Sequence, residues 1–383
     1  MHAFLGLTAR ASRPRTRDGR LSAAARNAAV RIPAVRAASG RITSVRIAAA
    51  RNAAVRIAAL PLAASAVLAG LPAATANAQS PPAVHTPEIR MLSWNICGEA
   101  GGLRGDAGYC PYRAEPAAKV EQVRQLVRKH RANVVMLQEV CGYAEGGRAA
   151  AAGSHMDLLG KALGAGWSIR HAAGARPDGR TDCRGGLTGD LGVLVAVRGE
   201  ITSARAANTL PPDPAGTSLQ TLPALCVTVR GWRPEVCTAH LVVGEDDPAD
   251  PGARAPRQVA EVVGFLGDAV RSGAVLGGDF NRNGGSPVLA ALNERMERCV
   301  DDVTRHGWDP ATGTHSWHRL DHFYATKAAT GSRYAWCGAD TSRMDTTAND
   351  PASGAPDGYS DHAPILGVVP GGPDTEPSRP GSW

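Results

Sequence analysis

Four apolar, strand-like runs of this chain carry a polar side chain at or near their end. The runs are I-R-M-L-S-W-N (89–95), N-V-V-M-L-Q-E-V (133–140), E-V-C-T-A-H-L (235–241) and A-V-L-G-G-D-F-N (274–281). Residues two apart on an extended chain point to the same side, so Asp279 and Asn281 would emerge together. An unpaired carboxylate beside a buried strand is costly, and Glu139 after V-V-M-L-Q is therefore hard to explain as a purely structural residue.

Helical patterns separate these strands. Residues 116–130 have Pro116 in a position suited to a first helical turn and valines on one face, and residues 256–271 repeat the pattern. A short helix is expected at 154–163, and Ser286 is expected to cap another helix. Two strand–helix–strand units of the same design predict an α/β fold in which helices pack on sheets.

Two late strands carry their polar residues at the start. Asp321 lies near the beginning of R-L-D-H-F-Y-A-T, and Asp361 and His362 precede A-P-I-L-G-V-V. If all the polar groups share one rim, the last two strands must run opposite to the others, which predicts a mixed sheet. The run at 191–198 is expected to be a further core strand. Two segments rich in Gly, Ala and Pro are expected to be loops, namely 142–190 (apart from the short helix) and 201–223.

The first 78 residues have the features of an export leader. Ile57 to Leu71 form an apolar run of 15 residues with arginines only upstream, and Ala76-Asn77-Ala78 follows as a small-x-small cleavage pattern. The run is short for a transmembrane helix, although an uncleaved anchor stays an alternative. Because A-R-N-A-A-V-R-I occurs at both 25–32 and 50–57, we interpret much of 1–50 as low-complexity sequence before the true start of translation.

The positive charge of the chain is concentrated in that leader. Residues 1–78 contain twelve Arg, no Lys and one acidic residue, Asp18, for a net of +11. Subtracting that +11 from the whole-chain value of +7 leaves −4 for residues 79–383. The predicted mature protein is therefore mildly acidic and has no global attraction to a polyanion.

The cysteines indicate disulfide bonds. All eight lie beyond residue 96, and an even number in an exported chain favours disulfides. The chain has no C-x-x-C pair, so a zinc ribbon is not favoured. The runs L-C-V-T-V-R and E-V-C-T-A-H flank a G-W-R-P turn, and folding that hairpin places Cys226 opposite Cys237. The remaining connectivity is open, and pairing of sequence neighbours would join 97–110, 141–183 and 299–337.

The polar residues form a set suited to phosphate-ester chemistry. Oxygen ligands suit Mg²⁺, Mn²⁺ or Ca²⁺, and imidazole suits proton transfer near neutral pH. A metal-neutralised phosphoryl oxygen and a His–carboxylate pair together fit hydrolysis of a phosphate ester. Gly277 and Gly278 would let backbone and substrate phosphate approach closely. The set is Asn95, Glu139, His240, Asp279, Asn281, Asp321, Asp361 and His362.

The blocks S-W-N, L-Q-E-V, T-A-H-L, G-D-F-N, L-D-H-F and S-D-H-A-P, in that order, resemble the endonuclease/exonuclease/phosphatase superfamily, built on the pancreatic-deoxyribonuclease fold. The resemblance spans about residues 88–369. It implies a four-layered α/β sandwich with two mixed β-sheets packed face to face and helices outside. The domain organisation that follows is an export leader at 1–78, a catalytic domain at 79–369 and a disordered tail at 370–383.

The resemblance implies a metal site. Glu139 would be the principal ligand with Asn95 beside it, and Asp361 would complete the metal environment. The cation would be Mg²⁺, with Mn²⁺ or Ca²⁺ as alternatives. Cys97 and Cys141 come two residues after Asn95 and Glu139 respectively, which suggests that disulfides brace these ligands.

The resemblance also implies catalytic roles. His362, held by Asp321, would form the His–Asp pair that activates water or stabilises the phosphorane. Asp279 would handle the proton of the water or the leaving group. Asn281 would donate to a phosphoryl oxygen, and His240 would contact the phosphate or protonate the leaving oxygen.

These features predict a secreted, monomeric, divalent-metal-dependent phosphoesterase, cleaved near Ala78 and without a membrane span in the mature chain. A nuclease acting on extracellular DNA or RNA is favoured, because an exported member without extra domains would degrade extracellular nucleic acid. One alternative is a phospholipid or small-molecule phosphodiesterase or phosphomonoesterase, for which Trp232 is the candidate membrane contact. A non-catalytic binding module has no need of the His–Asp pair. Five arginines could line a groove: Arg104, Arg113, Arg180, Arg184 and Arg282.

Overall fold

The structure is a computed structural model that describes residues 87–99, 109–143, 149–244, 252–329, 331–347 and 349–371. All of these residues belong to one compact unit. The predicted export leader (1–78) and nearly all of the predicted tail (370–383) lie outside the described residues.

Two six-stranded sheets make up the centre of the described chain. The first has the order β13 (Trp336–Ala339), β14 (Ile365–Val369), β1 (Ile89–Asn95), β2 (Val134–Cys141), β4 (Leu191–Arg198), β3 (Trp167–Ala173). The second has the order β5 (Ile201–Asn208), β6 (Pro223–Val229), β7 (Glu235–His240), β8 (Ala274–Asp279), β12 (Asp321–Thr326), β9 (Met296–Cys299). A separate hairpin joins β10 (Arg305–Asp309) to β11 (Thr314–His318).

Both sheets are mixed, as predicted. The pairs β1–β2 and β7–β8 are parallel. Parallel neighbours need a long crossover connection, and a helical segment supplies it in each pair. The late strands run the other way: β14 is antiparallel to β1, and β12 is antiparallel to β8. This reversal brings the starts of β12 and β14 to the rim where β1, β2, β7 and β8 end.

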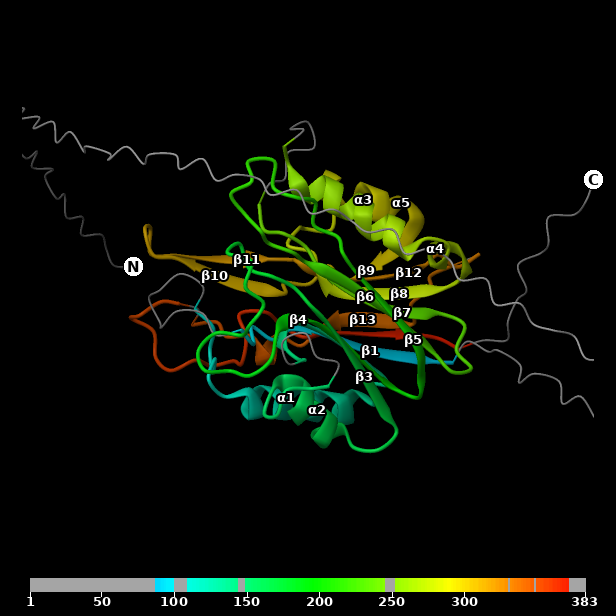
Figure 1. Ribbon diagram of the computed structural model, residues 1–383, viewed down its shortest axis with the longest axis horizontal. Helices are drawn as coiled ribbons and strands as arrows, with labels where there is room; N and C mark the ends of the chain where they lie inside the picture. The colour runs from blue at the N-terminus through cyan, green and yellow to red at the C-terminus, as the bar shows by residue number, and fades with distance from the viewer. Residues whose placement is uncertain are drawn as a thin grey trace, which may run out of the picture. The chain divides into compact units, whose positions relative to one another are not determined.

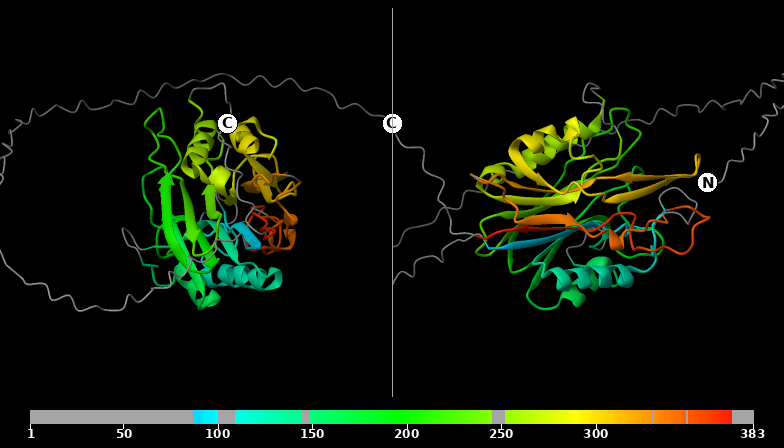
Figure 2. Two further views of the ribbon diagram at one scale, coloured as in Figure 1. Left: turned by 90° about the vertical axis from the view of Figure 1, so that its right-hand side faces the viewer. Right: turned by 180° about the vertical axis from the view of Figure 1, so that it is seen from behind.

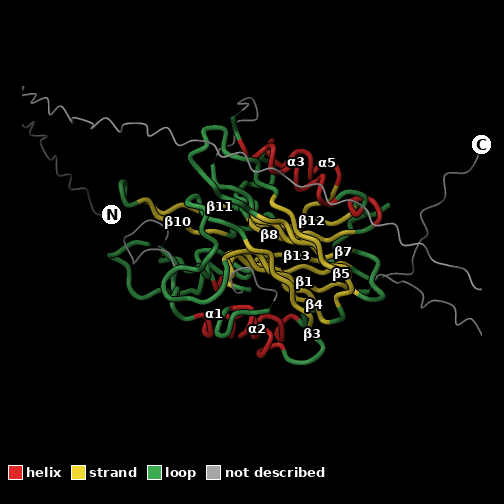
Figure 3. The backbone as a smooth tube through the Cα atoms, in the orientation of Figure 1, coloured by secondary structure: helices red, strands yellow, loops and turns green. Residues whose placement is uncertain are grey.

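Helices cover the outer faces of the two sheets. α1 (Pro116–His130) and α2 (His155–Leu163) lie on the first sheet, and α3 (Arg254–Leu266), α4 (Ala269–Ser272) and α5 (Ala290–Arg295) lie on the second (Figure 1). Two short 3₁₀ turns, η1 (Pro287–Leu289) and η2 (Thr341–Arg343), complete the elements. The layers helix, sheet, sheet, helix are visible in Figures 2 and 3, and they confirm the four-layered α/β sandwich. None of the described helices is long and apolar enough to span a membrane.

The helices begin and end where local chemistry dictates. α1 covers the predicted range 116–130, and Val120 and Val123 on its apolar face are buried against the first sheet. Ser154 caps α2 by accepting a hydrogen bond from the amide of Asp157 at 3.2 Å. The helix predicted at 256–271 is instead two helices, because Gly267 takes a φ of +57° and ends α3.

Two strands lie in segments that the sequence predicts as loops. β3 is the last strand of the first sheet, and β5 is the first strand of the second. Edge strands bury only part of their surface, and six of the eight β5 residues are exposed. Their sequences, W-S-I-R-H-A-A and I-T-S-A-R-A-A-N, therefore lack the apolar alternation that marks a core strand.

The two sheets pack directly on each other. Met136, Val195 and Phe323 are among the buried residues of this inter-sheet core. A Cβ on Gly277 would lie 2.5 Å from the Met136 sulfur, and one on Gly278 would lie 2.0 Å from the Ala239 carbonyl oxygen. These glycines make room for the facing sheet and the neighbouring strand, which confirms the close backbone approach expected at Gly278, and the approach of a substrate phosphate stays a prediction.

Four disulfides link the eight cysteines. Cys226 faces Cys237 across the β6–β7 pair, which confirms the bond predicted from the hairpin. The other six cysteines pair with their sequence neighbours: Cys97–Cys110, Cys141–Cys183 and Cys299–Cys337.

Gly277→Ala should destabilise the protein by about 1–3 kcal/mol, because the added methyl group overpacks the core against Met136 and Phe323. Gly285→Ala is the matched control, since no atom lies within 4 Å of a Cβ at that position. Urea denaturation of the three proteins measures the difference. Equal midpoints for the two variants would show that the sheets do not pack this closely.

Candidate active site

The eight predicted residues gather at one end of the two sheets, on both sides of the seam between them. Asn95 and Glu139 come from β1 and β2 of the first sheet, and Asp361 and His362 directly precede its strand β14. His240, Asp279 and Asp321 come from β7, β8 and β12 of the second sheet, and Asn281 follows β8. A cavity of about 650 Å³ opens there, lined by Glu139, His240, Asp279, Asn281, Asp361 and His362.

His362 is held between two carboxylates. Its Nδ1 lies 2.8 Å from Asp321 Oδ2, and its Nε2 lies 3.5 Å from Asp279 Oδ2. All three side chains are buried. Burial alone would lower the pKa of His362, but the charges of Asp321, Asp279 and Asp361 raise it to about 10. The imidazole is therefore protonated at neutral pH, with Asp321 behind it and the cavity in front.

The two carboxylates beside His362 differ in their protonation behaviour. Burial raises the pKa of Asp321 to about 6, although the charge of His362 opposes this. Burial also acts to raise the pKa of Asp279, but His362 and His240 together with hydrogen bonds from Asn95 and the Asn281 amide hold it below its usual value. Both carboxylates are ionised at neutral pH, and Asp279 is the one that lines the cavity.

Asn95 connects the carboxylates of the two sheets. Its Nδ2 donates to Glu139 Oε1 and to Asp279 Oδ2, both at 3.0 Å, and its Oδ1 accepts from the Cys97 amide at 2.9 Å. Glu139 lies at a register shift in the β2–β4 pairing and takes a φ of +52°. A bulge of this kind re-aims one side chain out of the strand's alternation, and here it turns Glu139 into the cavity.

His240 and Asn281 form a second pair. The Asn281 Nδ2 lies 3.2 Å from His240 Nε2 and donates to the Leu241 carbonyl at 2.8 Å. His240 Nε2 is also 3.5 Å from Asp279 Oδ2. A phosphoryl oxygen that accepts from Asn281 would have to replace one of these partners, so in this structure Asn281 orients His240.

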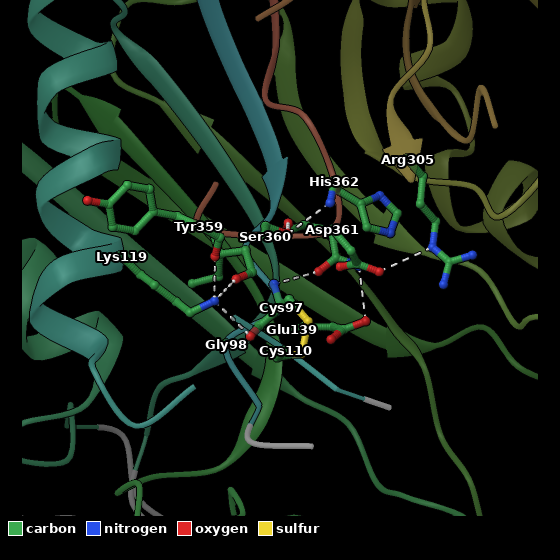
Figure 4. The surroundings of a disulfide bond; sticks show 12 residues. Cys97, Gly98, Cys110, Lys119, Glu139, Arg305, Tyr359, Ser360, Asp361 and His362 are labelled. Atoms are coloured by element: carbon green, nitrogen blue, oxygen red, sulfur yellow. Dashed lines mark hydrogen bonds and ion pairs between the residues drawn. A yellow bond between two sulfur atoms is a disulfide. The ribbon is translucent and has the colours of Figure 1, made fainter. Parts of the chain in front are cut away.

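Lys119 is a buried residue that links the backbone just after Asn95 to the backbone just before Asp361. It lies on α1, and its Nζ donates to the carbonyls of Ile96 (2.7 Å), Cys97 (3.1 Å) and Tyr359 (2.7 Å) (Figure 4). Burial lowers the pKa of Lys119 to about 7, against the raising effect of nearby carboxylates. Ser360 adds a further link, because its hydroxyl donates to the Asn95 carbonyl at 2.7 Å.

The donor set fits a hard divalent cation. Glu139 and Asp361 present carboxylates to the same cavity, whereas Asn95 turns its amide nitrogen toward Glu139 and its oxygen toward the Cys97 amide. Carboxylate and amide oxygens are the ligands that Mg²⁺, Mn²⁺ and Ca²⁺ prefer. The pKa of Glu99, beside them, is raised by burial and by the charge of Glu139. This excess of negative charge is what a bound cation would neutralise.

Two disulfides lie beside these residues. Cys97–Cys110 borders the cavity, and its sulfurs lie near the Glu139 carboxylate. Cys141–Cys183 begins two residues after Glu139. Their positions match the expectation that disulfides brace the backbone around Asn95 and Glu139.

Sequence reasoning missed Lys119 and Arg305. A charged residue beside Val120 on the apolar side of a predicted helix was the available signal for Lys119. Nothing marked Arg305, which lies in a hairpin absent from the predicted elements and reaches Asp361 Oδ2 at 3.3 Å. Of the arginines proposed to line a groove, Arg184 lines the cavity, whereas Arg282 is buried on backbone carbonyls and Arg104 lies outside the described residues.

Lys119→Met should lower the free energy of unfolding by about 1–3 kcal/mol, because it leaves three carbonyl oxygens without their donor. Lys161→Met on α2 is the matched control, since its exposed ammonium makes only a surface pair with Asp157. Chemical denaturation compares the two. A control variant as unstable as Lys119→Met would contradict a specific role for the buried ammonium.

The metal-free protein should lose stability as His362 deprotonates. Its pKa of about 10 in the folded protein exceeds the ordinary value of 6.5, so the folded state binds this proton more tightly. The stabilisation is complete below about pH 6.5 and is lost as the pH rises toward 10. Urea denaturation in EDTA at several pH values should show this slope in the wild-type protein and a flatter one in His362→Gln. Parallel slopes would rule out the ion pair.

Comparison with known proteins identifies the family of this chain. The sequence model of the Endonuclease/Exonuclease/phosphatase family matches residues 92–362. No curated protein sequence matches the chain.

Among solved structures, the fold is similar to an endonuclease/exonuclease/phosphatase family protein from Leptotrichia buccalis (12% identity, 73% of this chain and 99% of that one, TM-score 0.47). It is also similar to the mannosyl-6-phosphatase Bt3783 of Bacteroides thetaiotaomicron (16% identity, 73% of this chain and 99% of that one, TM-score 0.48). A third similar structure is the human Nocturnin catalytic domain (13% identity, 75% of this chain and 96% of that one, TM-score 0.46). On the family match over more than half of its length, this chain belongs to the endonuclease/exonuclease/phosphatase family of metal-dependent phosphoester hydrolases.

Proposed function

We propose that this protein is an exported, divalent-metal-dependent phosphodiesterase whose substrate is DNA or RNA. The observation that carries the proposal is the buried His362, held between Asp321 and Asp279 in the cavity that Glu139 and Asp361 also line. A cation, an ionised carboxylate and a set of hard oxygen donors converge there on one small volume.

The protonation states suggest which residue performs each catalytic role. Asp279 is ionised and faces the cavity, so it accepts the proton of the attacking water. His362 is already protonated, so its Nε2–H stabilises the negative charge that develops on the phosphoryl oxygens. Asp321 keeps the ring oriented through Nδ1. His240, oriented by Asn281, lines the cavity and is placed to contact the phosphate.

Glu139 and Asp361 would hold the metal ion, and Asn95 would join them if its Oδ1 exchanged the Cys97 amide for the cation. When bound, a divalent cation neutralises charge on a phosphoryl oxygen of the substrate. Mg²⁺ is the first candidate because the donors are oxygen atoms, and Mn²⁺ or Ca²⁺ suits the same ligands.

The lining of the cavity supports a nucleic-acid substrate. Its volume of about 650 Å³ accommodates more than a phosphate group, within the range of small-molecule sites. Arg184 supplies an exposed guanidinium group, and Tyr109 and Trp308 supply aromatic rings, whereas Arg176 is buried and paired with Glu99 and Asp182. Guanidinium binds phosphate and aromatic rings stack on bases. Trp232, the candidate for membrane contact, instead packs against the inter-sheet core.

Export is supported by the four disulfides, since such bonds persist in oxidising compartments. The apolar run and the cleavage pattern before Ala78 supply the means of export. With the leader removed, the mature chain acts as a monomer.

The purified, disulfide-bonded protein should nick supercoiled plasmid or degrade RNA, and should hydrolyse bis(p-nitrophenyl) phosphate, with Mg²⁺ or Mn²⁺ present. EDTA should abolish each activity, and added metal should restore it. His362→Ala should lower kcat by about 10²–10⁴, the range for loss of a group that stabilises charge or transfers a proton.

Activity that survives EDTA, or is unaffected by His362→Ala, would overturn the mechanism. Hydrolysis of sphingomyelin or p-nitrophenyl phosphate without cleavage of plasmid or RNA would overturn the nucleic-acid assignment while leaving the phosphoesterase intact. No hydrolysis of any ester with either Mg²⁺ or Mn²⁺ would favour a binding module.

A further inference from the structure

Arg305 is attached to the same backbone segment as Asp361 and His362. It is the first residue of β10 and forms an isolated antiparallel bridge with His362. The neighbouring amides complete the attachment: His306 donates to the Asp361 carbonyl at 2.9 Å, and Ala363 donates to the Thr304 carbonyl at 2.7 Å. Directly opposed residues of an antiparallel pair present their side chains on the same face, so Arg305 and His362 point to the same side.

The guanidinium of Arg305 enters the cavity. Its Nε lies 3.3 Å from Asp361 Oδ2, and its side chain is 36% exposed (Figure 4). Within the part of the chain that the structure describes, its two Nη groups have no protein hydrogen-bond partner. The fork of a guanidinium binds two oxygens of one phosphate, and here one edge is anchored while the other faces the cavity.

We infer that Arg305 is a further catalytic residue, whose Nη groups bind a non-bridging oxygen of the scissile phosphate and stabilise its transition-state charge together with His362. This inference rests on the proposed phosphoester hydrolysis. Lys119 cannot bind the phosphate in this way, because its ammonium is buried and donates to three carbonyls.

The charges of the site support this role. Glu139, Asp279, Asp321 and Asp361 carry four negative charges, and a substrate phosphate adds at least one more. Arg305 contributes a positive charge that does not depend on pH, and a divalent cation would contribute two more. The carboxylates and the phosphate still outnumber these positive charges, so removing Arg305 would increase the repulsion of an anionic substrate.

A narrower role must be separated from this one. Arg305 could instead serve only to orient Asp361, in which case its loss would lower activity by weakening metal binding. Loss of a partner that orients a metal ligand typically weakens metal binding by about 10–100-fold. Loss of a group that contacts the transition state lowers kcat even when the metal site is saturated.

The experiment compares wild-type protein with Arg305→Ala and Arg305→Lys, assayed on bis(p-nitrophenyl) phosphate at saturating Mn²⁺. Mn²⁺ affinity is measured separately by titration calorimetry. We expect kcat of Arg305→Ala to fall by about 100-fold or more, with Mn²⁺ affinity close to wild type. Arg305→Lys should be intermediate, because it keeps the charge and loses the fork. Added guanidinium chloride should raise the rate of Arg305→Ala several-fold and leave the wild-type rate unchanged.

Arg230→Ala serves as the control, since Arg230 is an exposed residue paired with Glu200 on the surface and should leave both kcat and metal affinity unchanged. Circular dichroism establishes that each variant is folded. If Arg305→Ala does not fold, the kcat of Arg305→Lys at saturating Mn²⁺ decides the question alone.

Three results would overturn the inference. A kcat of Arg305→Ala within a few-fold of wild type would show that the guanidinium does not contact the reacting phosphate. Weak Mn²⁺ binding with a rate restored by excess metal would reduce Arg305 to a positioning residue for Asp361. A wild-type protein inactive on every ester would remove the proposed function itself, a failure that is distinct from the first two.

Discussion

The buried ion pair between His362 and Asp321 joins the two sheets of this protein. His362 belongs to the segment that leads into β14 of the first sheet, and Asp321 begins β12 of the second, yet Nδ1 and Oδ2 lie 2.8 Å apart. A buried charge is tolerated only when it is paired, so each partner requires the other sheet to be in place. Asn95 makes a second connection, from β1 across to Asp279. The site is thus complete only when the sheets are packed face to face.

The same packing supports the backbone of the site with hydrogen bonds. Trp94, inside the first sheet, donates its indole N–H to the His362 carbonyl at 2.8 Å. Lys119 binds the backbone after Asn95 and before Asp361 from the outer helix layer. Glu139 and Asn281 hold left-handed backbone angles, which persist only where surrounding contacts over-determine them. The groups that line the cavity are therefore contacted by residues from three layers of the fold.

Particular elements show how far sequence patterns reach. The helix at 116–130 and the strands at 89–95 and 191–198 have the predicted bounds, because their periodic apolar faces are buried against neighbours. The edge strands β3 and β5 escape prediction because an edge strand needs only backbone partners and carries little apolar pattern. The hairpin β10–β11 also carries little apolar pattern and is not predicted, so the position of Arg305 is not predicted either.

The sequence alone determined the chemistry available to this protein: which carboxylates, amides and imidazoles stand beside buried strands, and in which order. It also determined the reversal of the last two strands, since the polar residues precede the apolar runs there. Only the tertiary structure decided which of these groups form hydrogen bonds and which carboxylates line one cavity, because those relations join residues of different sheets. It likewise decided that the pKa of His362 is raised, since that depends on the number of carboxylates buried around one ring.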